Sequence, residues 1–89
     1  MVWAIEFETA AKKELAKLDK TVALKITRFL AMRVAVLGNP RDIGEALKRS
    51  ELGEFWKYRV GDYRIICRIA DARITVVVVR VGNRKDVYR

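Results

Sequence analysis

Basic side chains stand two or four positions apart in two consecutive segments in the second half of the chain. Lys57 and Arg59 lie in the first segment, Arg64 and Arg68 lie in the second, and mostly apolar residues separate them. Successive residues of a β-strand point to opposite faces, so we expect the four cations to gather on one face of two adjacent strands. Like charges this close repel one another, and a fold tolerates them more readily when a polyanion neutralises them. The spacing therefore predicts a surface that binds a polyanion.

One reaction that a surface of this kind could serve, if the polyanion were RNA, is cleavage through the 2′-hydroxyl that RNA carries beside each phosphate. Cleavage requires removal of the hydroxyl proton, stabilisation of the phosphate oxyanions and protonation of the leaving 5′-oxygen. The chain contains no histidine. We therefore assign the proton acceptor to Lys57, because neighbouring cations lower the pKa of a lysine from its usual value of about 10.4. Arginine stays protonated in proteins, so Arg59 and Arg64 are expected to stabilise charge.

The elements that position these residues begin with an alternating segment, residues 2–8, which predicts a strand with Trp3, Ile5 and Phe7 on one face. Thr9 is expected to cap a short helix that runs to about Leu18. A second, longer helix is expected to begin after Asp19, with its apolar stripe facing the core, and to end at Gly38-Asn39-Pro40. Residues 38–53 are expected to form a loop, with a single helical turn around residues 43–48.

Three strands are predicted after this loop. Residues 55–60 and 63–69 are joined by Gly61-Asp62, a two-residue hairpin turn of the Gly-first kind. Asp71-Ala72 forms the next turn, and the β-branched run of residues 74–81 is expected to be a central strand buried on both faces. The predicted order is β-α-α-β-β-β. This is an α+β fold with two helices packed on one face of a mostly antiparallel, curled four-stranded sheet, as a single domain over residues 1–89.

The charge balance and the cysteine count restrict the class of protein. Lys and Arg total 19 against 11 Asp and Glu, a formal net charge of +8, which predicts nucleic acid or an acidic protein as the partner. The one cysteine, Cys67, cannot form an internal disulfide, so the reducing cytoplasm is the expected compartment. Glu6 and Glu8 interrupt the N-terminal apolar stretch, so we expect no signal peptide here. The longest apolar run is too short to span a bilayer.

Three segments resemble one protein family. The hairpin FWKYRVGDYRI (residues 55–65), the ending VRVGNRKDVY (residues 79–88) and the early helix AKKELAKLD (residues 11–19) resemble the RelE-type toxins of the RelE/ParE toxin–antitoxin superfamily. The resemblance implies the same fold order. It also implies a ribosome-dependent endoribonuclease that cleaves mRNA in the ribosomal A site without a cofactor or metal. It further implies that an acidic RelB-like antitoxin neutralises the toxin, and that the complex binds operator DNA.

Transferred position by position, the resemblance assigns an active site and a set of RNA contacts. The implied catalytic residues are Lys57, Arg59, Arg64, Arg84 and Tyr88. Arg84 would hold the phosphate or the leaving group, and Tyr88 would stack on a base or orient the nucleophile. The expected RNA-binding residues are Lys48, Arg68, Asn83 and Lys85.

Three departures from the family pattern keep alternatives open. Arg59 stands where several relatives carry a second lysine, Asn83 stands where many carry a histidine or a basic residue, and Arg49 stands where a glycine is usual. The first two remove proton-transfer capacity, so a catalytically weakened toxin that mainly binds antitoxin and operator DNA is one alternative. A ParE-like toxin that inhibits gyrase is the other.

Overall fold

Two α-helices and five strands make up the regular structure in the computed structural model, which describes residues 2–47 and 55–83. The elements in chain order are β1 (Ala4–Phe7), α1 (Thr9–Ala16), α2 (Lys20–Phe29), a π-helical turn (Leu30–Val34), a 3-10 turn (Pro40–Ile43), β2 (Glu45–Ala46), β3 (Phe55–Val60), β4 (Tyr63–Ala70), a second 3-10 turn (Asp71–Arg73) and β5 (Thr75–Asn83). The predicted order of helices and strands is confirmed, with the short strand β2 as an addition.

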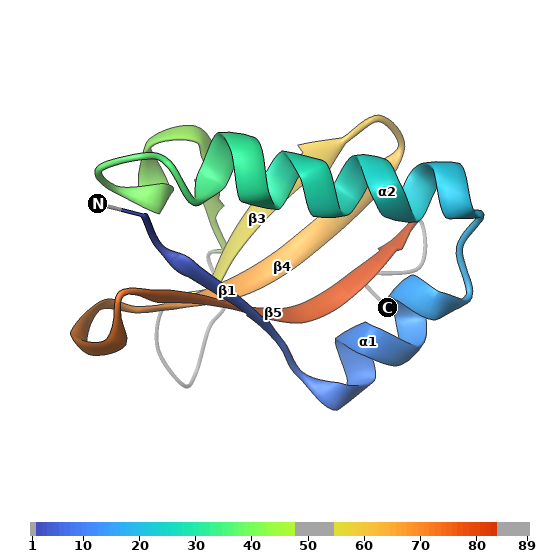
Figure 1. Cartoon of the computed structure of the whole chain (residues 1–89), viewed down its shortest axis with the longest axis horizontal. Helices are drawn as coiled ribbons and strands as arrows, with labels where there is room; N and C mark the ends of the chain where they lie inside the picture. Colours follow the sequence, from blue (N-terminus) through green and yellow to red (C-terminus); the bar gives the residue numbers. More distant parts are fainter. Residues whose placement is uncertain (1, 48–54, 84–89) are drawn as a thin grey trace.

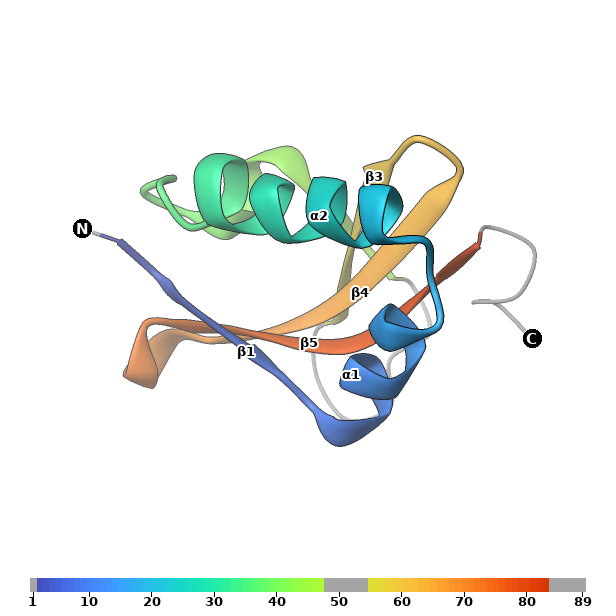
Figure 2. The same cartoon turned by 45° about the vertical axis from the view of Figure 1, so that its right-hand side comes forward.

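All the strands join one sheet in the order β1-β5-β4-β3-β2. β1 runs parallel to β5, and the remaining neighbours are antiparallel, as a meander of short connections requires. Helix α2 lies across one face of the curled sheet, and α1 packs beside the β1–β5 side (Figure 1 and Figure 2). The mostly antiparallel α+β architecture is therefore confirmed.

The strand count and the 38–53 loop differ from the sequence prediction. The sheet has five strands and not four, because Glu45 and Ala46 pair with Lys57 and Trp56 of β3. The single helical turn expected at residues 43–48 lies earlier, at Pro40–Ile43, where the Asn39 side chain accepts from the backbone N–H of Arg41 at 3.1 Å. Proline at the first position favours that turn, and pairing with a distant strand then determines the conformation of Glu45 and Ala46.

The β3–β4 hairpin follows the predicted register. Gly61 adopts φ +57°, the left-handed value that a Gly-first two-residue turn needs, and Val60 stands opposite Tyr63. Trp56 then stands opposite Cys67, and Tyr58 stands opposite Ile65. These pairs face the helices, so the basic positions between them necessarily face away from the helix layer.

One hydrophobic core joins the helices to the sheet. It combines α1, α2, the π-helical turn and the inner faces of β3, β4 and β5; its largest buried side chains include Tyr58, Ile26, Leu30, Ile65, Val34, Val76, Val78 and Val81. A bulge in β5 opposite Ile66 and Cys67 shifts the alternation, so that Val78 and Val81 both reach the core. The predicted burial of β5 on both faces holds for Thr75 to Val78.

The helix boundaries differ in detail from those predicted. Thr9 is the first residue of α1 and Glu8 occupies the N-cap, so the prediction of a Thr9 cap is wrong, and α1 ends at Ala16. Asp19 does precede α2, although its side chain makes no capping hydrogen bond. Within the described residues, no helix has the length and apolar character needed to cross a membrane.

Helix α1 also completes the edge of β5 beyond the point where β1 ends. β1 pairs with Thr75 to Val78, so the backbone N–H of Val81 lies past the last β1 residue. The carboxylate of Glu14 accepts from this N–H at 2.8 Å and from Arg80 Nε at 3.0 Å. A buried backbone donor needs a partner, and here a helix side chain replaces a strand.

We predict that the thiol of Cys67 is unreactive in the native protein. The residue is fully buried in the core, and burial raises the pKa of this thiol above its usual range, which removes the reactive thiolate. A coloured disulfide reagent such as DTNB should titrate one thiol in guanidine and essentially none in buffer over the same minutes. Rapid reaction of the native protein would contradict this packing.

Candidate active site

The basic residues of the hairpin lie on the sheet face that turns away from the helices. Arg59 of β3 stands directly opposite Arg64 of β4, and Gly82 of β5 stands on the other side of Arg64. Lys57 is on the same face, two residues before Arg59. The sequence prediction that the four hairpin cations share a face is confirmed, since Arg68 lies four residues beyond Arg64 on β4.

Arg64 is far more buried than a side chain on the open face of a sheet should be. Only 8% of the residue is exposed, and its Nη1 has no hydrogen-bond partner although the atom is out of contact with water. A buried donor without a partner costs about 1–3 kcal/mol, and more when the group is charged. A buried donor without a partner calls for a functional explanation, and for a guanidinium that explanation is an anion, so Arg64 is a candidate anion-binding residue.

A carboxylate that the sequence analysis did not single out lies beside Lys57. Glu45 of β2 stands opposite Lys57 in the register, and its Oε2 is 3.3 Å from Lys57 Nζ. The Glu45 side chain is 76% exposed and the Lys57 side chain 28% exposed. The contact places a carboxylate, which can accept a proton, directly beside a lysine, which can serve as a cation or a proton donor.

Three contacts hold β2 and its glutamate against β3. The buried Tyr58 hydroxyl donates to the Pro40 carbonyl at 2.6 Å, and burial first, then the nearby Cys67 thiol, raise the pKa of this hydroxyl, so it remains a donor. Gly44 lies so close to the Tyr58 ring that a Cβ there would meet Cε1 at 3.0 Å. The Leu47 N–H then donates to the Phe55 carbonyl at 2.9 Å.

Arg41 anchors the same segment from the other side. Its guanidinium lies 2.7 Å from the carboxylate of Asp71 and 5.8 Å from the centre of the Trp56 ring. The hydrogen bond from Arg41 lowers the pKa of Asp71, so the pair stays charged through the neutral range. The turn that precedes Glu45 is therefore fixed to both the β3 strand and the β4–β5 connection.

Arg68 does not belong to this cluster. It lies four residues further along β4 than Arg64, roughly 13 Å at the rise of a β-strand, and its guanidinium is 3.7 Å from Glu8. Glu45 and Glu8 approach the hairpin cations from other elements, so the basic face is not free of acidic groups. Neighbours distant in the sequence supply these carboxylates, so the strand pattern could not reveal them.

Two of the surface hollows are lined by arginine side chains, and they differ in whether those side chains already have acidic partners. A small pocket of about 90 Å³ is lined by Ile43, Glu45, Lys57, Tyr58, Arg59 and Arg64. The larger hollow, about 550 Å³, includes Arg68 and Arg73, and both guanidinium groups there already pair with Glu8 and Glu6. The small pocket combines the Lys57–Glu45 pair with Arg59 and Arg64, which have no acidic partner in the described part of the chain, and it is the better candidate.

Several predicted site residues cannot be placed beside this pocket. Lys48, Arg84, Lys85 and Tyr88, together with Arg49, lie outside the described residues. Asn83 is the last residue of β5 and stands opposite Tyr63 at the end of the hairpin. Over residues 2–47 and 55–83 no group of three potential metal ligands comes together.

The comparisons with known proteins agree with this fold. A family model described as ParE toxin of type II toxin-antitoxin system, parDE, matches residues 5–88. Toxin RelG of Mycobacterium tuberculosis is 34% identical, with 100% of this chain and 99% of the relative covered. The mRNA interferase toxin RelE of Escherichia coli is 31% identical, with 99% and 92% covered. The structure of the toxin–antitoxin complex RelBE2 of Mycobacterium tuberculosis matches with a TM-score of 0.82 and 31% identity, over 97% of this chain and 95% of that one.

The fold and these matches together define the toxin component of a type II toxin–antitoxin system. Within that class, the chain belongs to the RelE/ParE superfamily and is a toxin of the RelE type.

We predict that Arg59→Thr stabilises the free protein. Arg59 and Arg64 are like charges directly opposite each other, an arrangement that costs roughly 0.2–1 kcal/mol, and threonine is well suited to a strand. Urea unfolding at low ionic strength should show the gain, and added phosphate should reduce it by neutralising the wild-type pair.

Arg68→Thr is the matched control, because Arg68 is on the neighbouring strand and has Glu8 as its partner. It should bring no gain. Equal effects of the two substitutions would show that Arg59 and Arg64 do not repel each other.

Proposed function

We propose that the chain is a single-domain toxin over residues 1–89 that works in the cytoplasm as a ribosome-dependent endoribonuclease, cleaving mRNA in the A site and arresting translation. The observation that carries the proposal is the buried Arg64 side chain, whose Nη1 has no hydrogen-bond partner and which lines a pocket together with Lys57 and Glu45. Similarity to an mRNA interferase supports RNA as the polyanion.

The phosphate is the group that Arg64 and Arg59 would hold. Guanidinium groups present several donors in a fixed plane that matches phosphate oxygens, and both arginines stay charged throughout the reaction. Burial makes the Arg64 charge more effective, because water does not screen it. The scissile phosphate then supplies the partner that Arg64 lacks in the free protein.

The proton steps are best divided between Glu45 and Lys57. Glu45 accepts the 2′-hydroxyl proton, the 2′-oxygen attacks phosphorus, and the bond from phosphorus to the 5′-oxygen breaks. Lys57, whose Nζ lies 3.3 Å from the Glu45 carboxylate, gives a proton to the departing 5′-oxygen. The role of acceptor therefore passes from Lys57 to Glu45.

The presence of Glu45 supports an active enzyme over a weakened one, because Glu45 supplies the proton-transfer capacity that Arg59 and Asn83 do not. Arg84 and Tyr88 remain candidates for the roles expected from the sequence.

The proposed restraint is an acidic RelB-like antitoxin. Relatives have been solved in complex with their antitoxins, and the net charge of +8 favours an acidic partner. The toxin–antitoxin complex is the proposed form that binds operator DNA. The ribosome supplies positioning that a small domain lacks.

Primer extension on mRNA from cells that express the toxin tests the proposal. Wild-type chain should produce cuts within translated codons, and these should disappear in extracts without ribosomes. Arg64→Ala should reduce cleavage by about 10²–10³-fold, the loss typical of a group that stabilises an oxyanion. Glu45→Gln should reduce it by about 10²–10⁴-fold, the contribution typical of a general base.

Arg68→Ala is the matched control, because it removes an arginine of β4 that pairs with Glu8 outside the pocket. Its cleavage should stay within a few-fold of wild type. Growth arrest with intact messages would refute the nuclease, and full cleavage by Glu45→Gln with loss in Lys57→Gln would return the acceptor role to Lys57.

Gyrase inhibition is the second candidate, favoured by the description of the matching family as ParE toxins. Purified chain should then block supercoiling of plasmid DNA in a reaction without ribosomes. A chain that neither cleaves mRNA nor inhibits gyrase, and does not arrest growth, would instead be a module that binds antitoxin and operator DNA.

A further inference from the structure

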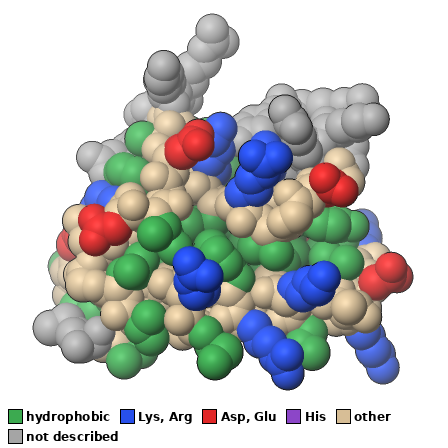
Figure 3. Space-filling model, turned by 90° about the horizontal axis from the view of Figure 1, so that it is seen from above, with side chains coloured by type: hydrophobic (Ala, Val, Ile, Leu, Met, Phe, Trp, Pro, Cys, Tyr) green, Lys and Arg blue, Asp and Glu red, His purple; other side chains and the backbone are tan. Residues whose placement is uncertain are grey.

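The outer face of α2 and of the π-helical turn that continues it, together called the outer face of α2 below, carries an unusual row of exposed apolar side chains. Leu24 is 50% exposed, Met32 is 68% exposed, and Val36, in the turn that follows the helix, is 55% exposed. A single exposed apolar residue is ordinary, whereas several along one face mark a surface for another molecule. Figure 3 looks onto this side, where apolar and basic side chains lie together and acidic ones lie toward the margins.

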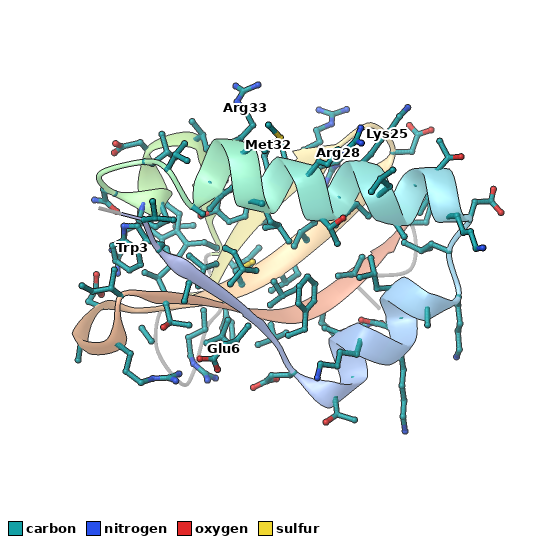
Figure 4. The ribbon with its side chains drawn as sticks, in the orientation of Figure 1. Trp3, Glu6, Lys25, Arg28, Met32 and Arg33 are labelled. Atoms are coloured by element: carbon teal, nitrogen blue, oxygen red, sulfur yellow. The ribbon has the colours of Figure 1, made fainter. Side chains whose placement is uncertain are left out.

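Uncompensated cations flank this row. No acidic residue occurs between Asp19 and Asp42, while Lys25, Arg28 and Arg33 project from the helix away from the sheet (Figure 4). None of these three has an acidic partner within the described part of the chain. Five cations elsewhere do, namely Arg41, Lys57, Arg68, Arg73 and Arg80. The positive charge of the helix layer is therefore left for a partner.

A π-helical turn keeps the row on one face. In an α-helix each four-residue step, as from Leu24 to Arg28 and on to Met32, rotates about 40° beyond a full turn. The Ala35 N–H donates to the Leu30 carbonyl at 2.8 Å, which is the hydrogen bond between residues five apart that defines a π-helical turn. The turn contains one more residue than an α-helical turn, and the extra residue offsets the rotation of about 40°. Leu30 and Val34 still reach the core, and Met32 still points outward.

The combination of apolar and basic groups selects one kind of occupant. RNA would pair with the cations and leave Leu24, Met32 and Val36 in water. A second copy of the chain would bring three cations against three cations. We propose that the outer face of α2 docks an acidic amphipathic helix of another protein, whose apolar stripe covers this row and whose carboxylates pair with Lys25, Arg28 and Arg33.

This docking surface is separate from the candidate active site. α2 covers the sheet face that carries Tyr58 and Ile65, whereas Arg59 and Arg64 lie on the opposite face. The two surfaces can be occupied together, so the inference stands whether or not the pocket cleaves RNA.

A designed peptide tests the surface. The probe is about 18 residues long so that it can form a helix alone, with leucine along one face and glutamate elsewhere. It should bind the folded toxin in a 1:1 complex and perturb the amide resonances of α2 and not those of β3 and β4. Arg28→Glu and Met32→Ser should each weaken binding by at least about tenfold, because one reverses a central charge and the other removes the most exposed apolar contact.

Two controls separate docking on α2 from general attraction between a basic protein and an acidic peptide. Lys12→Glu makes the same charge change on α1 and should leave affinity within about twofold of wild type, and a peptide with lysine in place of glutamate should not bind. The proposal is overturned if the acidic peptide fails to bind, or if Arg28→Glu and Met32→Ser bind it like wild type. It is also overturned if both variants no longer bind a single-stranded RNA oligonucleotide but still bind the peptide. Thermal unfolding of each variant confirms that this exposed face, not the fold, is altered.

Discussion

The Gly61–Asp62 turn fixes the register of β3 against β4, and the site depends on that register. With Val60 opposite Tyr63, Tyr58 stands opposite Ile65 and this pair faces the helices. Arg59 and Arg64, which also stand opposite each other, then face away from the helices. A slip of one residue would exchange the two faces and place arginines in the core, which the burial of Tyr58 and Ile65 opposes. The stability of the core thus holds Arg59 and Arg64 directly opposite each other in spite of their repulsion.

Stability and function conflict at this point in the molecule. A buried arginine whose Nη1 has no hydrogen-bond partner and two like charges in direct opposition both lower the stability of the free protein. A site of this kind is prepared for its ligand in advance, because the donors need not reorganise when a phosphate arrives. The helices and β5 supply the apolar burial that compensates for the strain on the other face of the sheet.

The short strand β2 converts a basic surface into a site capable of acid–base chemistry. It is two residues long, yet it is held by the Tyr58 hydroxyl, by the close approach of Gly44 to the tyrosine ring and by Arg41 on Asp71. Those contacts place Glu45 against Lys57, where the two groups balance each other's charge. In the described part of the helix layer, Lys25, Arg28 and Arg33 have no equivalent carboxylates, and these cations are left available to a partner.

The sequence alone determined the order of elements, the two faces of the hairpin and the membership of a toxin family, because these depend on period-two alternation, turn chemistry and contiguous motifs. It also placed Lys57, Arg59 and Arg64 together, since a two-residue turn leaves one register. Only the tertiary structure decided that Glu45 pairs with Lys57, that Glu8 removes Arg68 from the cluster and that Arg64 is buried. These facts depend on segments far apart in the chain, and no local pattern encodes which distant side chain will fill the space beside a strand.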